Sequence, residues 1–416
     1  MTEKKAPMLT NTLLILLFSM IVANIGGQMY GPLLPLYVQE LGADMNQIGI
    51  FFTLSMVAPL LFQILGGWLS DAIGRVQAMA IGSVAGLAGY LMFVLAPSWQ
   101  WLLLAMVGMA VATSFVGPSF QAFVAEESPE ESRGKVFGIV QGLFLIVGVI
   151  GAPLGGYLAD NYGFRLMFGV AAGLYGLATI IRLFMARKIR LAQSAPGEKP
   201  TFAHLKTSIA SIVGLLTAGG VVTWIFLSDG VGDVTFSMVG NLFPLYLNNI
   251  VGISMTELGI LGAVSSVASM VFMMAGGALS DKYGERVGIV IGNLLVGGAI
   301  FIMLNVQTLA LLSVAWILLG IGQALFGPAY SSLISKAVPQ KLRGTAFGLF
   351  STSLGIISLP APYLGVLLWE TFNPKVPFYI PLIAMMLMLP VVWIKFRLPK
   401  APDAEEPVPV AAPVEG

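Results

Sequence analysis

The sequence has no cysteine, a single histidine and few charged residues, and each shortage excludes a kind of site. Without cysteine, the chain of 416 residues forms no disulfide, thiolate nucleophile, zinc ribbon or iron–sulfur cluster. The single histidine, His204, lies in a polar stretch and cannot build a histidine-based metal site. We therefore expect no metal and no cofactor.

Charge and motifs also exclude other functions. The net charge is only +1 and the basic residues are scattered, so the chain has no basic patch that would bind nucleic acid. The sequence contains neither a GxxxxGK[ST] loop nor a GxGxxG loop after a strand, the two common phosphate-binding motifs. These absences argue against an enzyme.

What the chain has in excess is apolar sequence. Apolar residues make up 57% and charged residues 10%, against about 25% charged in soluble domains. Most of the surface must therefore face lipid. A membrane-spanning helix needs about 20 apolar residues. Twelve such stretches are present, at residues 11–38, 47–70, 76–96, 99–124, 135–159, 164–187, 218–247, 256–280, 287–306, 308–335, 344–370 and 377–396.

The loop charges predict the orientation. If both termini are cytoplasmic, the outer loops hold only Arg165 and Lys375, and nearly all other basic residues lie inside. This distribution follows the positive-inside rule. Compact loops and the absence of a transit peptide favour the cytoplasmic (plasma) membrane of a prokaryote.

The chain divides into four parts by composition. Residues 1–187 and 218–398 each hold six predicted spans. Residues 188–217 form a polar cytoplasmic linker, in which apolar residues at helical spacing over 202–216 predict a short amphipathic helix. Residues 399–416 are rich in Pro, Ala and Glu, and we expect a disordered tail.

The two halves repeat each other. GGWLSDAIGR at 66–75 returns as GGALSDKYGE at 276–285, so Asp71 and Asp281 stand 210 residues apart (281 − 71). The same spacing relates residues 117–138 to residues 327–348. Further upstream the spacing is 209, because Pro-x-Tyr at 35–37 returns at 244–246. Two homologous halves in a membrane chain indicate a transporter whose substrate path lies between them.

At these motifs the chain resembles the major facilitator superfamily, whose hallmark loop between helices 2 and 3 has the form G-x-L-a-D-r-x-G-r-r/k. The first copy matches at Gly67, Leu69, Asp71, Gly74 and Arg75. The second copy matches at Gly277, Leu279, Asp281, Lys282, Gly284 and Arg286. In the first copy Ala72 and Val76 depart from the pattern, and the second copy has Glu285 before Arg286. The resemblance covers the whole chain and implies an all-α membrane fold: twelve helices in two pseudo-symmetric six-helix bundles that rock around a cavity lined by helices 1, 4, 7 and 10.

The resemblance further implies a cytoplasmic latch. Asp71, held by Arg75, would accept hydrogen bonds from the N-terminus of helix 11, and Asp281 with Arg286 would do the same at helix 5. The basic residues at these two helix starts are Arg133 and Arg343. The alternative is that these residues only build tight turns and satisfy the positive-inside rule.

Predicted helix 5 holds a glycine–proline cluster, with Gly151, Pro153, Gly155 and Gly156. It is similar to the helix 5 motif of the family's exporters, although Ala152 replaces the glycine before proline. The alternative is ordinary packing of small residues between helices. The arginine that family antiporters often have in helix 4 is missing, because Leu104 stands at that position.

Two acids interrupt predicted helix 7. Asp229 and Asp233 are four residues apart, so their Cβ atoms lie about 5–6 Å apart on one helix face. An aspartate at the bilayer centre is unfavourable by roughly 2.5–3.5 kcal/mol, which implies a use. Because we find no buried Lys or Arg to neutralise them, we expect at least one to exchange a proton during transport, with Asp233 favoured. A sodium site and a purely structural, hydrogen-bonded pair are the alternatives.

Other candidates for the cavity are polar or aromatic residues at similar depth. They are Asn24 and Gln28 on helix 1, Thr113, Ser114 and Phe115 on helix 4, and Gln323 and Phe326 on helix 10. For the polar residues the alternative is an interhelical hydrogen bond, and for the aromatic residues it is packing or lipid contact.

No Arg or Lys reaches the predicted cavity, which disfavours anionic substrates. The sequence therefore favours a secondary transporter, working by alternating access, that exports small lipophilic neutral or cationic compounds in exchange for protons. This function is similar to that of the family's drug:proton antiporter branch. The alternatives are an importer or uniporter of a neutral metabolite and, from another class, a non-transporting receptor or lipid-handling protein. We expect a monomer that needs only the bilayer, its substrate and protons, with sodium less favoured.

Overall fold

The computed structural model describes residues 9–62, 73–190, 220–337 and 355–397, and within them every regular element is helical. Lipid offers no partner to backbone amides and carbonyls, so spanning segments must satisfy these groups internally, as helices do. The predicted linker helix at 202–216 and the tail at 399–416 lie outside the described residues.

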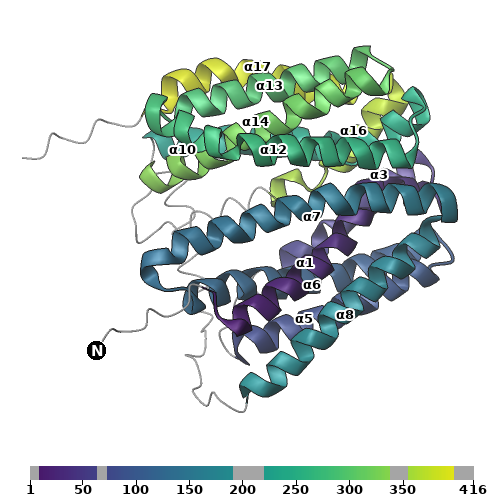
Figure 1. The fold of residues 1–416 in the computed structure, drawn as a ribbon. Helices are drawn as coiled ribbons and strands as arrows, with labels where there is room; N and C mark the ends of the chain where they lie inside the picture. Colours follow the sequence, from purple (N-terminus) through teal and green to yellow (C-terminus); the bar gives the residue numbers. More distant parts are fainter. Residues whose placement is uncertain (1–8, 63–72, 191–219, 338–354, 398–416) are drawn as a thin grey trace, which may run out of the picture.

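The described helices form two bundles, stacked one above the other in Figure 1. The N-terminal bundle contains α1 (Asn11–Tyr30), η1 (Gly31–Leu33), α2 (Leu34–Glu40), α3 (Met45–Ser55), α5 (Arg75–Leu95), α6 (Trp99–Glu127), η2 (Glu130–Ser132), α7 (Arg133–Tyr162) and α8 (Phe164–Arg190). The C-terminal bundle contains α10 (Gly220–Val239), α11 (Leu242–Leu245), η3 (Tyr246–Val251), α12 (Met255–Tyr283), α13 (Glu285–Asn305), α14 (Leu309–Ala337), α16 (Ala361–Thr371) and α17 (Val376–Lys395).

The predicted all-helical membrane fold is confirmed. Ten described segments are long and apolar enough to cross a membrane. The predicted span 218–247 is not one regular helix: α10 ends at Val239, and α11 and the π-helical η3 continue to Val251. Of the predicted span 344–370, the structure describes only the part from residue 355, which contains α16.

The sequence repeat is also a structural repeat. Helices α5 and α6 correspond to α13 and α14, whose bounds lie 210 residues later at both ends. Gly74 and Gly284, 210 residues apart, both adopt positive φ, at +104° and +88°, a conformation that favours glycine. Both α3 and α12 begin with a capping box, Asp44 with Gln47 and Ser254 with Glu257.

For the remaining helices, matching contacts in the two bundles show which residues correspond. The glycines Gly155 and Gly365 each press against a backbone carbonyl, that of Met29 in α1 and of Met238 in α10. The spacing is therefore 209 between α1 and α10. Similarly, Phe168 of α8 packs on Tyr37 with ring centroids 4.8 Å apart, and Phe378 of α17 packs on Tyr246 at 5.2 Å. Helices α8 and α17 are thus equivalent at a spacing of 210.

The two bundles meet along α7 with α12 and along α3 with α16 (Figure 1). We call the end where α1 begins and α17 ends the proximal end, and the end where α7 ends and α12 begins the distal end. In the distal half, Gly156 of α7 presses on the Met255 carbonyl of α12, and Gly49 of α3 lies against Tyr363 of α16. In the proximal half, no described atom outside the helix itself lies within 4 Å of a Cβ built on Gly134 or Gly142 of α7. The bundles are closed on each other at the distal end.

Polar contacts join the bundles at this closed end. The Asp160 carboxylate, near the end of α7, accepts hydrogen bonds from the backbone N–H of Met255 at 3.1 Å and of Thr256 at 2.6 Å, and from the Thr256 hydroxyl. These are the first residues of α12, so one bundle caps a helix of the other. Gln39 and Asn249, 210 residues apart, also pair across the interface at 3.1 Å.

Candidate functional site

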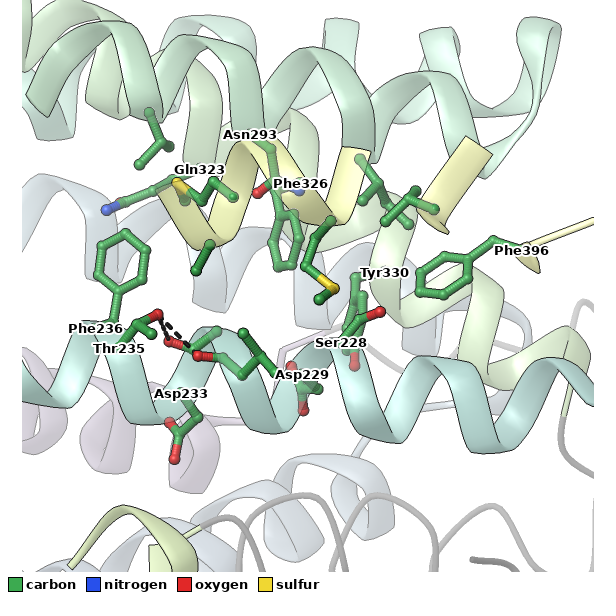
Figure 2. Close-up of a pocket in the computed structure, with 18 of the residues that line it drawn as sticks. Ser228, Asp229, Asp233, Thr235, Phe236, Asn293, Gln323, Phe326, Tyr330 and Phe396 are labelled. Carbon is green, nitrogen blue, oxygen red and sulfur yellow. Dashed lines mark hydrogen bonds between the residues drawn. The ribbon is translucent and has the colours of Figure 1, made fainter. Parts of the chain in front are cut away.

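A cavity of about 300 Å³ lies inside the C-terminal bundle, between α10, α13, α14 and α17 (Figure 2). Its size is at the lower end for ligand pockets. The lining residues are Ser228, Asp229, Val231, Gly232, Asp233, Thr235, Phe236, Ile289, Asn293, Val296, Leu319, Gln323, Phe326, Tyr330, Ala384, Met385, Met388, Val392 and Phe396. Two of these residues are acids and none is basic.

The two acids are held by different helices. The Ser358 hydroxyl, in the segment before α16, donates a hydrogen bond to Asp233 Oδ2. Asp229 instead faces the hydroxyl of Tyr330 on α14, close enough for an electrostatic interaction. In Figure 2, Asp233 points to the opposite side of α10 from Phe236. Asp229 is therefore coupled to the interior of the bundle, and Asp233 to the segment that leads into α16.

Aromatic and amide side chains form the opposite wall. Phe326 stacks on Tyr330 of the same helix, with ring centroids 5.2 Å apart and planes 14° apart. Asn293 of α13 and Gln323 of α14 lie across the cavity from α10 in Figure 2. The Thr235 hydroxyl is occupied by its own helix, because it donates to the carbonyls of Val231 and Gly232. The amides, the carboxylates and the Ser228 hydroxyl are thus polar groups available to a ligand.

Four of the sequence-predicted candidates meet at this cavity, namely Asp229, Asp233, Gln323 and Phe326. The candidates of the N-terminal bundle lie elsewhere. Asn24, Gln28 and Thr113 are exposed on α1 and α6, and Asn24 and Thr113 donate to carbonyls of their own helices. Ser114 and Phe115 are buried, with Phe115 against Gly82 of α5.

Comparison with known proteins identifies the family. The model described as Major Facilitator Superfamily matches this sequence twice, at residues 16–233 and 225–414, which is nearly the whole chain. The chain belongs to the major facilitator superfamily. The two matches also agree with the two bundles.

Curated relatives and solved structures support this membership. A "Multi-drug resistance efflux pump PmrA homolog" of Lactococcus lactis is 26% identical over 341 residues, covering 79% of this chain and 81% of that protein. "Multidrug resistance protein MdtG" of Proteus mirabilis is 24% identical over 405 residues, covering 93% and 96%. A peptide transporter solved with alafosfalin superposes with a TM-score of 0.74 at 15% identity, covering 93% of this chain and 95% of that chain, and shows the fold alone.

For a superfamily member we expected a cavity lined by helices 1, 4, 7 and 10. The cavity found in the described residues is lined by two of these, α10 and α14, which are helices 7 and 10 of the fold. Its other walls are α13 and α17, the ninth and twelfth helices. Among the described residues, those that line the site all belong to the C-terminal bundle.

The superfamily latch is only partly described. Gly67, Asp71 and Arg343 lie outside the described residues, and Gly74 and Gly284 form the expected turns. Arg75 pairs with Glu126 at 3.0 Å.

In the second copy, Arg286 donates to the Trp393 carbonyl at 2.9 Å and lies over the Trp393 ring, and within the described parts of the chain Asp281 forms no hydrogen bond. At the start of helix 5, Arg133 begins α7, and no described atom outside the helix itself lies within 4 Å of a Cβ built on Gly134 or on Gly277 of α12. The described residues therefore show no contact between Asp281 and the start of α7, while the opposite end of the molecule is closed, and the latch stays a prediction.

The glycine–proline cluster of α7 packs on two helices at once. Gly151 and Gly155 press on α1, at Gln28 and Met29, while Gly156 presses on the start of α12. Pro153 lies within α7 and contacts Gly259 of α12 from the other side. Close helix packing accounts for each of these small residues, and the cluster forms part of the distal closure.

Sequence reasoning missed one buried charge. Arg182 of α8 is only 1% exposed and lies among α1, α5 and α8. Its guanidinium donates to Ser19 Oγ at 3.2 Å, Ser83 Oγ at 2.7 Å, the Ser19 carbonyl at 3.3 Å and Met20 Sδ at 3.0 Å. From the sequence we found no buried Lys or Arg beside the two acids of helix 7, and Arg182, which lies in the other bundle, was overlooked. The signal was present, because Arg182 lies five residues inside the predicted span 164–187.

Proposed function

We propose that this chain is a proton-coupled exporter of small lipophilic neutral or cationic compounds. The observation that carries the proposal is the cavity, an apolar chamber in which Asp229 and Asp233 are the only charged lining residues among the described parts of the chain. An acidic site without a basic residue favours cations and disfavours anions. The names of the two relatives above, a multi-drug resistance efflux pump homolog and a multidrug resistance protein, support export.

The positions of the two acids suggest separate roles. Asp229 faces the interior of the bundle and would attract the substrate. Asp233 accepts a hydrogen bond from Ser358, outside the α10, α13, α14 and α17 group. Protonation of Asp233 would weaken this bond and loosen α10 from the segment before α16, because a neutral carboxyl is a poorer acceptor than a carboxylate. Proton uptake would thereby change the contact between two helices of the bundle.

We further propose that the proximal end faces the cytoplasm. The described basic residues there include Arg75, Arg133, Lys135, Arg187, Lys188, Lys282, Arg286, Lys336, Lys395 and Arg397. Only Arg165 and Lys375 lie at the distal end, and this asymmetry follows the positive-inside rule. The distal closure then shuts the extracellular side. We also propose that the protein works as a monomer.

The test uses proteoliposomes with an imposed pH gradient and ethidium as a fluorescent lipophilic cation. We expect gradient-driven ethidium movement with the wild-type protein and its loss in Asp233→Asn. Glu370→Gln is the matched control, because Glu370 is exposed and makes no hydrogen bond within the described residues. Asp229→Asn should reduce ethidium affinity more than gradient coupling.

Three outcomes would contradict the proposal. Full gradient-driven transport by Asp233→Asn would remove proton coupling from this residue. No ethidium movement by any variant, with uptake of a neutral metabolite in an unbiased screen, would favour an importer or uniporter. If neither type of compound moves, a receptor or lipid-handling role on the same fold takes precedence.

A further inference from the structure

The cavity and the buried Arg182 occupy equivalent places in the two halves of the repeat. Helices α8 and α17 are equivalent at a spacing of 210 residues, so Arg182 corresponds to Val392, which lines the cavity. Both side chains are buried, with 1% and 2% exposure. Where the N-terminal bundle holds a guanidinium, the C-terminal bundle holds a valine and open space.

The partners of Arg182 also have counterparts in the cavity wall. At the spacing of 209 between α1 and α10, Ser19 corresponds to Ser228 and Met20 to Asp229. At the spacing of 210 between α5 and α13, Ser83 corresponds to Asn293. All three counterparts line the cavity. The groups that surround a guanidinium in one half therefore surround a cavity in the other.

Two of these substitutions strengthen the cavity as a cation site, although Tyr175, whose ring centroid lies 6.0 Å from the Arg182 guanidinium, is replaced by Met385. The thioether of Met20 is replaced by the carboxylate of Asp229, and a charged acceptor forms a stronger bond. The hydroxyl of Ser83 is replaced by the amide of Asn293, whose oxygen accepts. Ser228 Oγ is buried and has no hydrogen-bond partner among the described residues, whereas Ser19 Oγ accepts from Arg182 and donates to the Leu16 carbonyl.

We propose that this cavity binds the guanidinium or amidinium group of a small amphipathic compound, seated where Arg182 sits in the other half. Its planar N–H donors bond to Asp229, Asn293 and Ser228, and its apolar body lies along Phe326, Met385 and Met388. The assignment of the ligand as substrate rests on the proposed function, and the binding chemistry does not.

The Ser228 hydroxyl, which has no hydrogen-bond partner among the described residues, favours a cation that has N–H donors. A guanidinium presents five donors in a plane, as Arg182 does, and satisfies several acceptors at once. A quaternary ammonium has the same charge and no donor, so it would leave Ser228 and Asn293 unsatisfied. An unsatisfied buried polar group is unfavourable, and the site should discriminate between the two cations on this ground.

The test compares hexylguanidinium with hexyltrimethylammonium, two cations of equal charge and equal alkyl chain. Binding to the detergent-solubilised protein is measured by titration calorimetry, without any transport. We expect hexylguanidinium to bind at least about tenfold more tightly, a ratio that corresponds to ~1.4 kcal/mol. Equal affinities would overturn the proposal.

Two variants locate the site. Val392→Arg introduces a guanidinium at the position equivalent to Arg182. This side chain should occupy the proposed site and abolish hexylguanidinium binding. Ile394→Arg is the matched control, because Ile394 is exposed on the same helix, and it should bind as the wild type does. Unchanged binding in Val392→Arg would contradict the proposed position of the ligand.

A third variant keeps the proposal testable if Val392→Arg does not fold. Asn293→Leu removes an acceptor without changing charge, so it should lower the preference for hexylguanidinium and leave hexyltrimethylammonium affinity unchanged. A parallel loss for both cations would overturn the proposal. The two hypotheses fail separately: binding without gradient-driven transport would refute the exporter, and transport of ethidium without guanidinium preference would refute this inference.

Discussion

Replacing Asp160 by asparagine should open the distal end. The Asp160 carboxylate caps the first two amides of α12 from the opposite bundle, at 3.1 Å and 2.6 Å. Asparagine retains one acceptor oxygen but loses the negative charge, so both the hydrogen bonds and the interaction with the helix dipole weaken. Asp160 and the start of α12 belong to different bundles. Weakening their hydrogen bonds therefore shifts the equilibrium from distal-closed to distal-open molecules.

The magnitude follows from the exposure of the site. A capping side chain contributes about 0.5–2 kcal/mol, and the solvent around the exposed Asp160 screens its charge. We take ~1.4 kcal/mol, which increases the ratio of distal-open to distal-closed molecules about tenfold.

The chain contains no cysteine, so Trp101→Cys with Phe372→Cys can be spin-labelled without background. Both positions are exposed near the distal end, one in each bundle. Pulsed electron paramagnetic resonance then measures the two distance populations.

The repeat supplies the control for this experiment. Glu370 stands 210 residues after Asp160, yet it is exposed and forms no hydrogen bond in the described parts of the chain. The reason lies in the caps: α3 begins at the charged Asp44, whereas α12 begins at the neutral Ser254 and can accept a further anion. Glu370→Gln should therefore leave the distances unchanged. Identical distance distributions for Asp160→Asn and the wild type, or an equal shift in Glu370→Gln, would refute the reasoning.

Three further predictions concern packing and backbone. Gly156→Ala should also open the distal end, by about 1–3 kcal/mol, because its methyl group meets the Met255 carbonyl; Gly173→Ala, with open space beside it, should not shift the same distances. Arg182→Ala should lower stability by about 2–4 kcal/mol in thermal unfolding, and Arg182→Met should cost less because it fills the space. Gly284→Ala should lower the free energy of unfolding by about 1–2 kcal/mol, because φ at this position is +88°. The change should appear as a lower unfolding temperature.

Much of the fold could be predicted because its signals are local and doubled. Long apolar runs predict spanning helices, and the repeated motifs predict two equivalent bundles, which the equal lengths of α5 and α13 confirm. The break after Val239 could not be predicted from hydropathy. The apolar run continues into α11, and the local signals are single residues, Pro244 in α11 and Asn248 with Asn249 in η3.

The candidate site could be predicted only on α10 and α14. Asp229 and Asp233 are conspicuous because charge is rare at membrane depth. Asn293 could not be found in this way, since it is a single amide in an apolar helix that the resemblance did not place at the cavity. Val392 could not be found either, because a valine has no chemical signal of its own. Its importance comes from the larger Arg182 at the equivalent position, which fills the N-terminal counterpart of the cavity.

The two halves therefore differ where a symmetric scaffold has no reason to differ. Positions that build the framework are alike in both halves, as with Gly155 and Gly365 or Phe168 and Phe378. A duplicated bundle would have filled both interiors or left both open. Here one interior is closed by its own arginine and the other is open, with a carboxylate, an amide and an unsatisfied hydroxyl around the space. A bundle closed by an internal cation serves as a fixed partner, and the bundle that lacks this cation is the one in which a ligand can supply it.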